Sequence, residues 1–124
     1  KLAIGGNAIT STGVGVLLET MDHITDLDIG HHNRIGSEGA SLLATALGNN
    51  ALPNLTRLTL WLCDGDDGFT ALVLALKQNT SLLYLNLQNN YGFSERAFWV
   101  LAESLPEIKV LQQANLTWCK GIAS

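Results

Sequence analysis

Charged residues, cysteines and long hydrophobic runs are all scarce in this sequence. Only 15% of the 124 residues are charged, whereas 47% are hydrophobic, a balance that argues against a disordered chain. No apolar run approaches the roughly 20 residues needed to cross a bilayer. The length predicts one domain whose core is large enough to fold without disulfides or structural metals.

Basic residues are few and scattered along the chain. Seven Lys and Arg oppose eleven Asp and Glu, which gives a net charge of −4. Surfaces that bind nucleic acid or acidic membranes need clustered Lys and Arg, so we expect no nucleic-acid partner and no membrane partner. Cys63 and Cys119 are too few for a disulfide framework or a zinc set. We expect both to be buried free thiols in a reducing compartment.

An internal repeat is the most informative feature of the sequence. Four segments align, and each has apolar residues at its first, fourth and sixth positions: ITDLDIGHHNRI (24–35), LTRLTLWLCDGD (55–66), LLYLNLQNNYGF (82–93) and LQQANLTWCKGI (111–122). They begin 31, 27 and 29 residues apart. Apolar residues at alternate positions predict half-buried strands. We expect these strands near residues 2–5, 25–30, 56–61, 83–88 and 112–117.

A helical pattern follows the first three of these segments. Apolar residues recur at three- and four-residue spacing in GSEGASLLATAL (36–47), GFTALVLAL (68–76) and AFWVLAESL (97–105), which predicts helices with a wide buried stripe. An earlier unit, LAIGGNAITSTGVGVLLETM (2–21), shows the same order of strand and helix. Ser37 and Ser94 are plausible helix N-caps.

The spacing L-x-x-L-x-L-x-x-N/C, with Cys63, Asn90 and Cys119 at its last position, resembles the leucine-rich repeat. The stretch NRIGSEGASLLATAL (33–47) resembles the ribonuclease-inhibitor-like class of that family. The resemblance implies an α/β fold: a right-handed solenoid, or horseshoe, with a parallel β-sheet on the concave face and α-helices on the convex face. It covers essentially residues 1–124 and implies a single domain of about four and a half repeats.

The sequence departs from this pattern at several positions. His32 stands where the pattern has Asn or Cys, Asp66 where other units are apolar, and Ala114 where a Leu is expected. Gly68 comes two residues early, so we expect a shortened or distorted turn. The chain begins inside a repeat, stops after a strand and has no polar capping repeat. We therefore expect a segment of a longer array, or a domain whose ends meet a partner; the uncapped ends would permit end-to-end self-association.

One cluster of residue types is suited to a divalent metal. Imidazoles and carboxylates of neighbouring turns are potential ligands; they are His31, His32, Asp64, Asp66 and Asp67. The stretch DGDDG (64–68) resembles the start of a calcium loop, but Phe69 and Ala75 occupy the positions that require Gly and Glu. Solvated turn residues explain the cluster more simply, so we predict no metal site.

No catalytic pattern is present in the sequence. It contains no nucleophile elbow, no phosphate-binding loop and no Ser-His-Asp order. Gly5 and Gly6 are interpreted as turn residues. Cys63 and Cys119 fall on the repeat's own Asn/Cys position, which explains them without a catalytic thiol. We predict that the chain is not an enzyme, has no catalytic residues and binds no cofactor.

Three N-x-S/T sequons occur, at Asn54, Asn79 and Asn115. In a secreted protein they would be acceptors for glycans. Because Asn followed by Leu-Thr or Thr-Ser arises readily where this repeat enters its strand, we interpret them as coincidental.

The residues between the inward leucines should form the binding surface. Alternate strand residues point away from the core, and stacked units align them into rows. Trp61 would lie near the centre of this surface beside Gly30, with Tyr84 and Arg57 close by. Trp, Tyr and Arg are enriched at binding hot spots, and nearby charges can set the choice of partner. The candidate residues are Asp26, Asp28, Arg57, Thr59, Trp61, Tyr84, Asn86 and Gln88.

An alternative is that Trp61 lies flat over its neighbours and only shields the sheet. The other tryptophans are interpreted first as packing at the C-terminal end of the array. Trp99 should face outward or toward the next repeat, and Trp118 should lie at a strand exit.

We therefore predict a protein-protein interaction module that binds a protein partner through the concave sheet. Two alternatives stay open. One is a segment of a GTPase-activating protein, because a Ran GTPase-activating-like family has this repeat class; no catalytic residue of that family matches a position here. The other is a structural spacer in a larger receptor or effector. The resemblance implies a cytoplasmic protein, or an effector delivered into a host cell.

Overall fold

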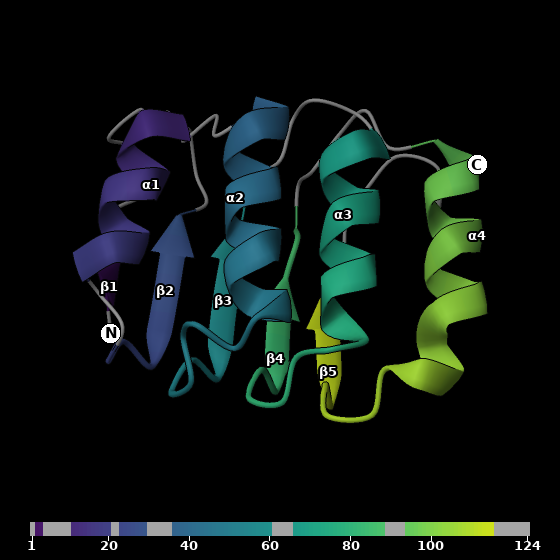
Figure 1. Ribbon diagram of the computed structural model, residues 1–124. Helices are drawn as coiled ribbons and strands as arrows, with labels where there is room; N and C mark the ends of the chain where they lie inside the picture. The colour runs from purple at the N-terminus through teal and green to yellow at the C-terminus, as the bar shows by residue number, and fades with distance from the viewer. Residues whose placement is uncertain are drawn as a thin grey trace.

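The computed structural model describes residues 2–3, 11–20, 23–29, 36–60, 66–88 and 94–115. Strands and helices alternate along these residues in an α/β arrangement (Figure 1). The elements are β1 (Leu2–Ala3), α1 (Ser11–Thr20), β2 (Asp26–Ile29), α2 (Gly36–Gly48), β3 (Arg57–Leu60), α3 (Asp66–Leu76), β4 (Tyr84–Asn86), α4 (Glu95–Ser104), the 3-10 turn η1 (Leu105–Glu107) and β5 (Gln113–Asn115).

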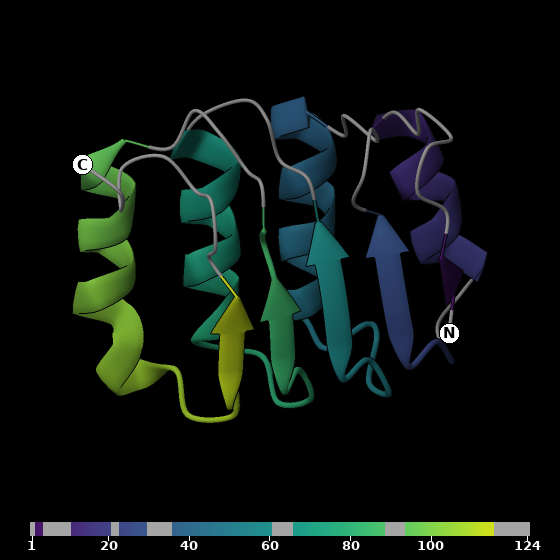
Figure 2. The same cartoon turned by 180° about the vertical axis from the view of Figure 1, so that it is seen from behind.

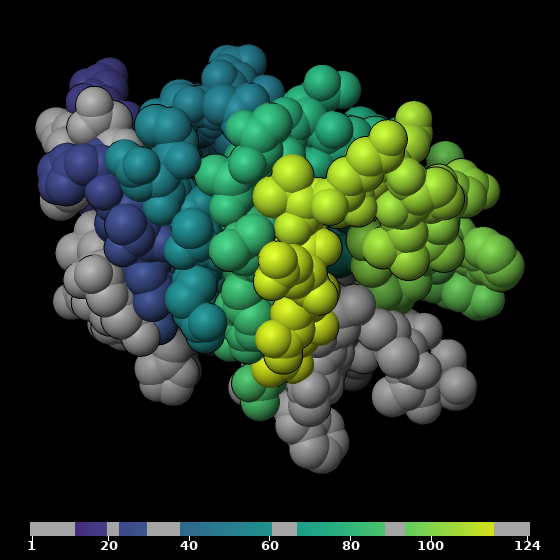
Figure 3. Space-filling view, turned by 90° about the horizontal axis from the view of Figure 1, so that it is seen from below, coloured from purple at the N-terminus to yellow at the C-terminus, as the bar shows by residue number. Residues whose placement is uncertain are grey.

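The strands form one parallel sheet in chain order, β1-β2-β3-β4-β5. The four described helices stand on one side of the sheet, and Figure 2 shows its opposite side. Viewed from the end at which the strands begin, successive units lie side by side from blue through green to yellow (Figure 3). The predicted α/β fold with a parallel sheet and repeat-like units is confirmed.

The core lies between the sheet and the helices, because alternate strand residues point toward the helices. The buried strand positions are Leu27, Ile29, Leu58, Leu60 and Leu85, and Leu87, directly after β4, is buried as well. Each of β2, β3 and β4 is preceded by one more buried apolar residue: Ile24, Leu55 and Leu82. These are the first, fourth and sixth positions of the sequence repeat. In the last segment, by contrast, Leu111 is half-buried and Ala114 is exposed.

The helices close the core with apolar stripes at helical spacing. Ala40, Leu43 and Leu47 of α2 are buried. The corresponding stripe of α3 consists of Phe69, Leu72, Val73, Ala75 and Leu76. The ring of Phe69 also packs on that of Phe98 in α4, with centroids 5.5 Å apart. Burying one such side chain contributes roughly 1.5–3 kcal/mol, so each helix depends on its neighbours for most of its stability.

Two helix starts test expectations from the sequence. Ser94 is the N-cap of α4, as predicted, but its side chain makes no capping hydrogen bond. Helix α3 begins at Asp66, two residues before the predicted start at Gly68. Asp67 therefore lies in its first turn, where a carboxylate is favourable because the helix dipole is positive at that end.

Two asparagines, Asn50 after α2 and Asn79 after α3, link neighbouring units through their side chains. Asn50 has a positive φ of 55°, which Asn tolerates better than most residues. Its side-chain oxygen accepts hydrogen bonds from the backbone N–H and the hydroxyl of Thr80, both at 2.9 Å. Asn79 is buried and donates to the carbonyl oxygen of Leu47. Neighbouring units are thus joined by polar contacts as well as by the core. Among the described residues no helix has the length and apolarity needed to cross a membrane.

Candidate functional site

The sheet face opposite the helices, called the open sheet face below, presents two complete rows of side chains. The strand register pairs Asp26 with Arg57, Arg57 with Tyr84, and Tyr84 with Gln113. A second row pairs Asp28 with Thr59, Thr59 with Asn86, and Asn86 with Asn115. All of these residues are exposed or half-buried, whereas the strand residues between them are buried in β2, β3 and β4. None of the described helices covers this face (Figure 2).

Arg57 is at the centre of the clearest side-chain cluster on this face. Its guanidinium carbon lies 4.3 Å from the centroid of the Tyr84 ring, a cation–π contact. Its Nε atom is 3.8 Å from a carboxylate oxygen of Asp26. That distance allows electrostatic attraction but exceeds hydrogen-bond range. The three residues come from three adjacent strands, so the sheet register itself brings them together.

A shallow hollow of about 270 Å³ lies beside this cluster, where β3, β4 and β5 begin. Its lining residues are Thr56, Arg57, Leu83, Tyr84, Gln112 and Gln113. The backbone there is held in place because the carbonyl oxygens of Thr56 and Leu83 each accept two N–H groups from the next strand. The three strands are therefore hydrogen-bonded to one another at the hollow, and all of its lining residues except Leu83 have polar side chains.

The β4–β5 side of the open sheet face carries amides rather than charges. Asn86 accepts a hydrogen bond from the backbone N–H of Gln88 at 2.9 Å. The side chain of Asn115 donates to the side-chain oxygen of Gln88 at 3.4 Å. Amide groups both donate and accept hydrogen bonds. This part of the face can therefore contact a polar surface without a requirement for charge of one sign.

The structure brings together seven of the eight candidate residues predicted from the sequence. Asp26, Arg57 and Tyr84 share one row, and Asp28, Thr59 and Asn86 share the next. Gln88 follows β4 and contacts the second row. The eighth residue, Trp61, lies outside the described residues. Its predicted position at the centre of the face stays a prediction.

The metal and thiol candidates fall largely outside the described residues. These are His31, His32, Cys63, Asp64 and Cys119. Asp66 and Asp67 begin α3 instead of lying in a turn. Within the described part of the chain, no group of three or more His, Cys, Asp and Glu could hold a metal ion.

The three sequons differ in their surroundings. Asn79 is only 5% exposed, and its amide nitrogen donates to Leu47 O at 3.0 Å. A glycan on that nitrogen would be incompatible with both the burial and the hydrogen bond. Asn115 lies on β5, in the second row of the open sheet face. Asn54 is exposed in the connection between α2 and β3.

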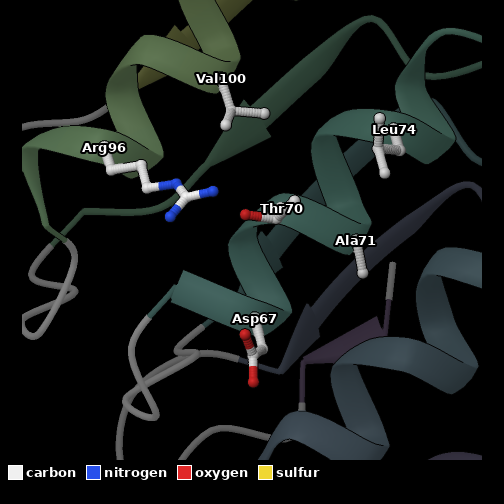
Figure 4. A pocket seen from close by; sticks show the side chains of 6 residues that line it. All are labelled: Asp67, Thr70, Ala71, Leu74, Arg96 and Val100. Atoms are coloured by element: carbon white, nitrogen blue, oxygen red, sulfur yellow. The ribbon is translucent and has the colours of Figure 1, made fainter.

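A second surface feature, not predicted from the sequence, is a groove of about 550 Å³ between α3 and α4 (Figure 4). Ala71, Leu74 and Val100 provide its apolar part, and Asp67, Thr70 and Arg96 its polar end. The Arg96 side chain extends from α4 toward Thr70 of α3. Leu74 is 49% exposed although it belongs to a helix rich in buried residues. Its position outside the helical stripe is the only sequence signal for this groove.

The side chains of the open sheet face include amides, carboxylates, one guanidinium and one phenol. Groups of these kinds can donate and accept hydrogen bonds and can stack on other planar groups. No protein-family model matches the chain, and no curated protein matches it in sequence.

Proposed function

We propose that the chain is a leucine-rich-repeat solenoid of the ribonuclease-inhibitor-like class that binds a protein partner through the open sheet face. The repeat spacing supports the family, since the leucine positions it shares with that class are the buried strand positions. The sequential parallel sheet with helices on one side supports a solenoid, in which each unit stacks only on its neighbours.

The observation that carries the binding proposal is the Arg57–Tyr84 stack on a face that no described helix covers. Stacking holds an otherwise flexible arginine in place before a partner arrives. A partner then loses less side-chain entropy on binding, which is how preorganisation raises affinity. Tyr and Arg are also the residue types most often found at energetic hot spots.

The test is an affinity capture from cell lysate with three forms of the domain. One is the natural sequence, the second is Asn86→Arg on the open sheet face, and the third is Ala102→Arg on α4. Asn86 is half-buried in the second row, and Ala102 is exposed on a helix. Both substitutions add one positive charge and one long side chain, so Ala102→Arg is a matched control.

We expect a protein that is retained by the natural sequence and by Ala102→Arg but lost by Asn86→Arg. Melting temperatures of the three forms show whether each one folds. Loss of the captured protein with Ala102→Arg alone would indicate that the binding surface lies on the helices, which would contradict the proposal. Capture of nothing by any folded form would favour the structural-spacer alternative.

A further inference from the structure

We propose that Arg57 is an anchor for one carboxylate of the partner, supplied by an Asp or Glu side chain. This proposal rests on the proposed function, because it identifies the chemistry that the open sheet face recognises. It assigns the hollow at the start of β3, β4 and β5 as the position of that carboxylate.

The guanidinium of Arg57 is oriented by two neighbouring side chains but has no hydrogen-bond acceptor among the described residues. Its side chain is 57% exposed. The Tyr84 ring supports one face of the group at 4.3 Å, and Asp26 lies 3.8 Å from Nε. The planar fork of Arg matches a carboxylate with two parallel hydrogen bonds. Both neighbours restrict the fork, and neither of them accepts a hydrogen bond from it.

The hollow gives an incoming side chain room and additional donors. It lies beside Arg57 and is lined by Gln112 and Gln113, which are exposed. Amide N–H groups donate to carboxylate oxygens. A volume of about 270 Å³ is at the small end of sites that hold a ligand. It is therefore suited to one side chain and not to a folded segment.

The surrounding charge favours a single carboxylate over a phosphate. Arg57 is the only cation among the described strand residues of the open sheet face. Phosphate recognition in peptides generally uses several Arg residues. Asp26 and Asp28 stand on the adjacent strand, so they oppose a dianion or an acidic cluster more strongly than they oppose one carboxylate.

The direct test uses sodium acetate as the probe and observes arginine side-chain N–H signals by NMR. Sodium chloride at equal ionic strength corrects for screening. Arg96 is an internal control, since it is an exposed arginine that makes no ion pair or ring contact with the described residues. We expect acetate to shift the Arg57 signals saturably and more than those of Arg96. Equal shifts for the two arginines would overturn the proposal.

A Tyr84→Leu variant adds a second readout for the same titration. It keeps the charge and much of the apolar volume but removes the ring that supports the guanidinium. We expect a smaller acetate shift at Arg57 in this variant. An unchanged shift would overturn the claim that stacking orients the anchor.

Binding to the captured partner separates this inference from the proposed function. We expect Arg57→Gln to weaken binding by about ten-fold to a hundred-fold, as loss of a charged hydrogen-bond pair does. Arg57→Lys should recover only part of the affinity, because it keeps the charge but lacks the fork. If Asn86→Arg abolishes binding while Arg57→Gln leaves it unchanged, the open sheet face binds the partner and the carboxylate anchor is wrong. If neither affects binding, the proposed function fails as well.

Discussion

The side-chain amide of Asn79 donates a 3.0 Å hydrogen bond to the carbonyl oxygen of Leu47, 32 positions earlier in the chain. The oxygen of the same side chain accepts from the backbone N–H groups of Ser81 and Leu82, at 3.0 and 2.7 Å. One buried residue thus satisfies a carbonyl near the end of α2 and orders the chain that enters β4. Carbonyls at helix ends lack partners within their own helix. Leu47 O accepts from the backbone N–H of Asn50 at 3.2 Å, and the Asn79 amide gives it a second hydrogen bond.

Asn79→Ala should lower the free energy of unfolding by about 2–3 kcal/mol, because it removes three hydrogen bonds to backbone groups, two of them buried and one part-buried. Urea denaturation measures the change. Asn54→Ala is the control, since Asn54 is exposed, and it should change stability by less than about 0.5 kcal/mol. Equal changes for the two substitutions would show that the hydrogen bonds of Asn79 make no net contribution to the free energy of unfolding.

Leu85→Ala should destabilise the fold by about 2–5 kcal/mol, because it leaves a cavity between the sheet and the helices. Leu85 is 4% exposed, whereas Leu83 on the same segment is 36% exposed. Leu83→Ala removes the same atoms from a more solvent-exposed position and should lower the free energy of unfolding by about 1 kcal/mol or less. Thermal or urea unfolding of both variants tests the register of β4, and a reversed order of stability would contradict it.

Breaking the Asp26–Arg57 pair should hardly affect stability. The two groups are 3.8 Å apart, and the Arg57 side chain is largely exposed, so water and salt screen the attraction. A double-mutant cycle with Asp26→Asn and Arg57→Gln should give a coupling energy of about 0–1 kcal/mol. A coupling above about 2 kcal/mol would mean that the pair supports the fold, and the proposed binding role would lose its basis.

Phe98 and Trp99 should respond differently to truncation although they are adjacent. Phe98 is half-buried against Phe69, and Trp99 is 61% exposed. Phe98→Ala should cost about 2 kcal/mol through lost packing. Trp99→Ala should cost under about 1 kcal/mol, as is usual for surface positions. Melting temperatures compare the two, and a larger loss for Trp99 would place that ring in a packed interface.

The residue periods were sufficient to predict alternating strands and helices with inward leucines, and the resemblance to leucine-rich repeats implied that the strands are parallel. Leu58 and Leu85 illustrate this, since both are buried at the positions where the repeat requires an apolar residue. The number of repeats, the solenoid and its partner stay predictions. The exposed position of Trp99 agrees with the outward orientation expected from its place in the helical pattern.

Long-range polar contacts were not predictable in the same way. From the sequence, Asn79 is recognisable only as part of a sequon, because its hydrogen-bond partner, Leu47 O, is distant along the chain. Helix α3 starts at Asp66, before its first apolar residue, and apolar spacing alone does not indicate such a start. The α3–α4 groove likewise depends on how two helices approach each other, which no local pattern specifies.

Each strand of the sheet pairs only with the strands that are adjacent to it along the chain. Insertion or deletion of one complete strand–helix unit would therefore leave every other pairing in place. Each added unit would widen the sheet by about 4.8 Å, the usual spacing of strands. Duplication of the gene segment that encodes one unit would thus widen this surface by a fixed step, while the other units keep their structure.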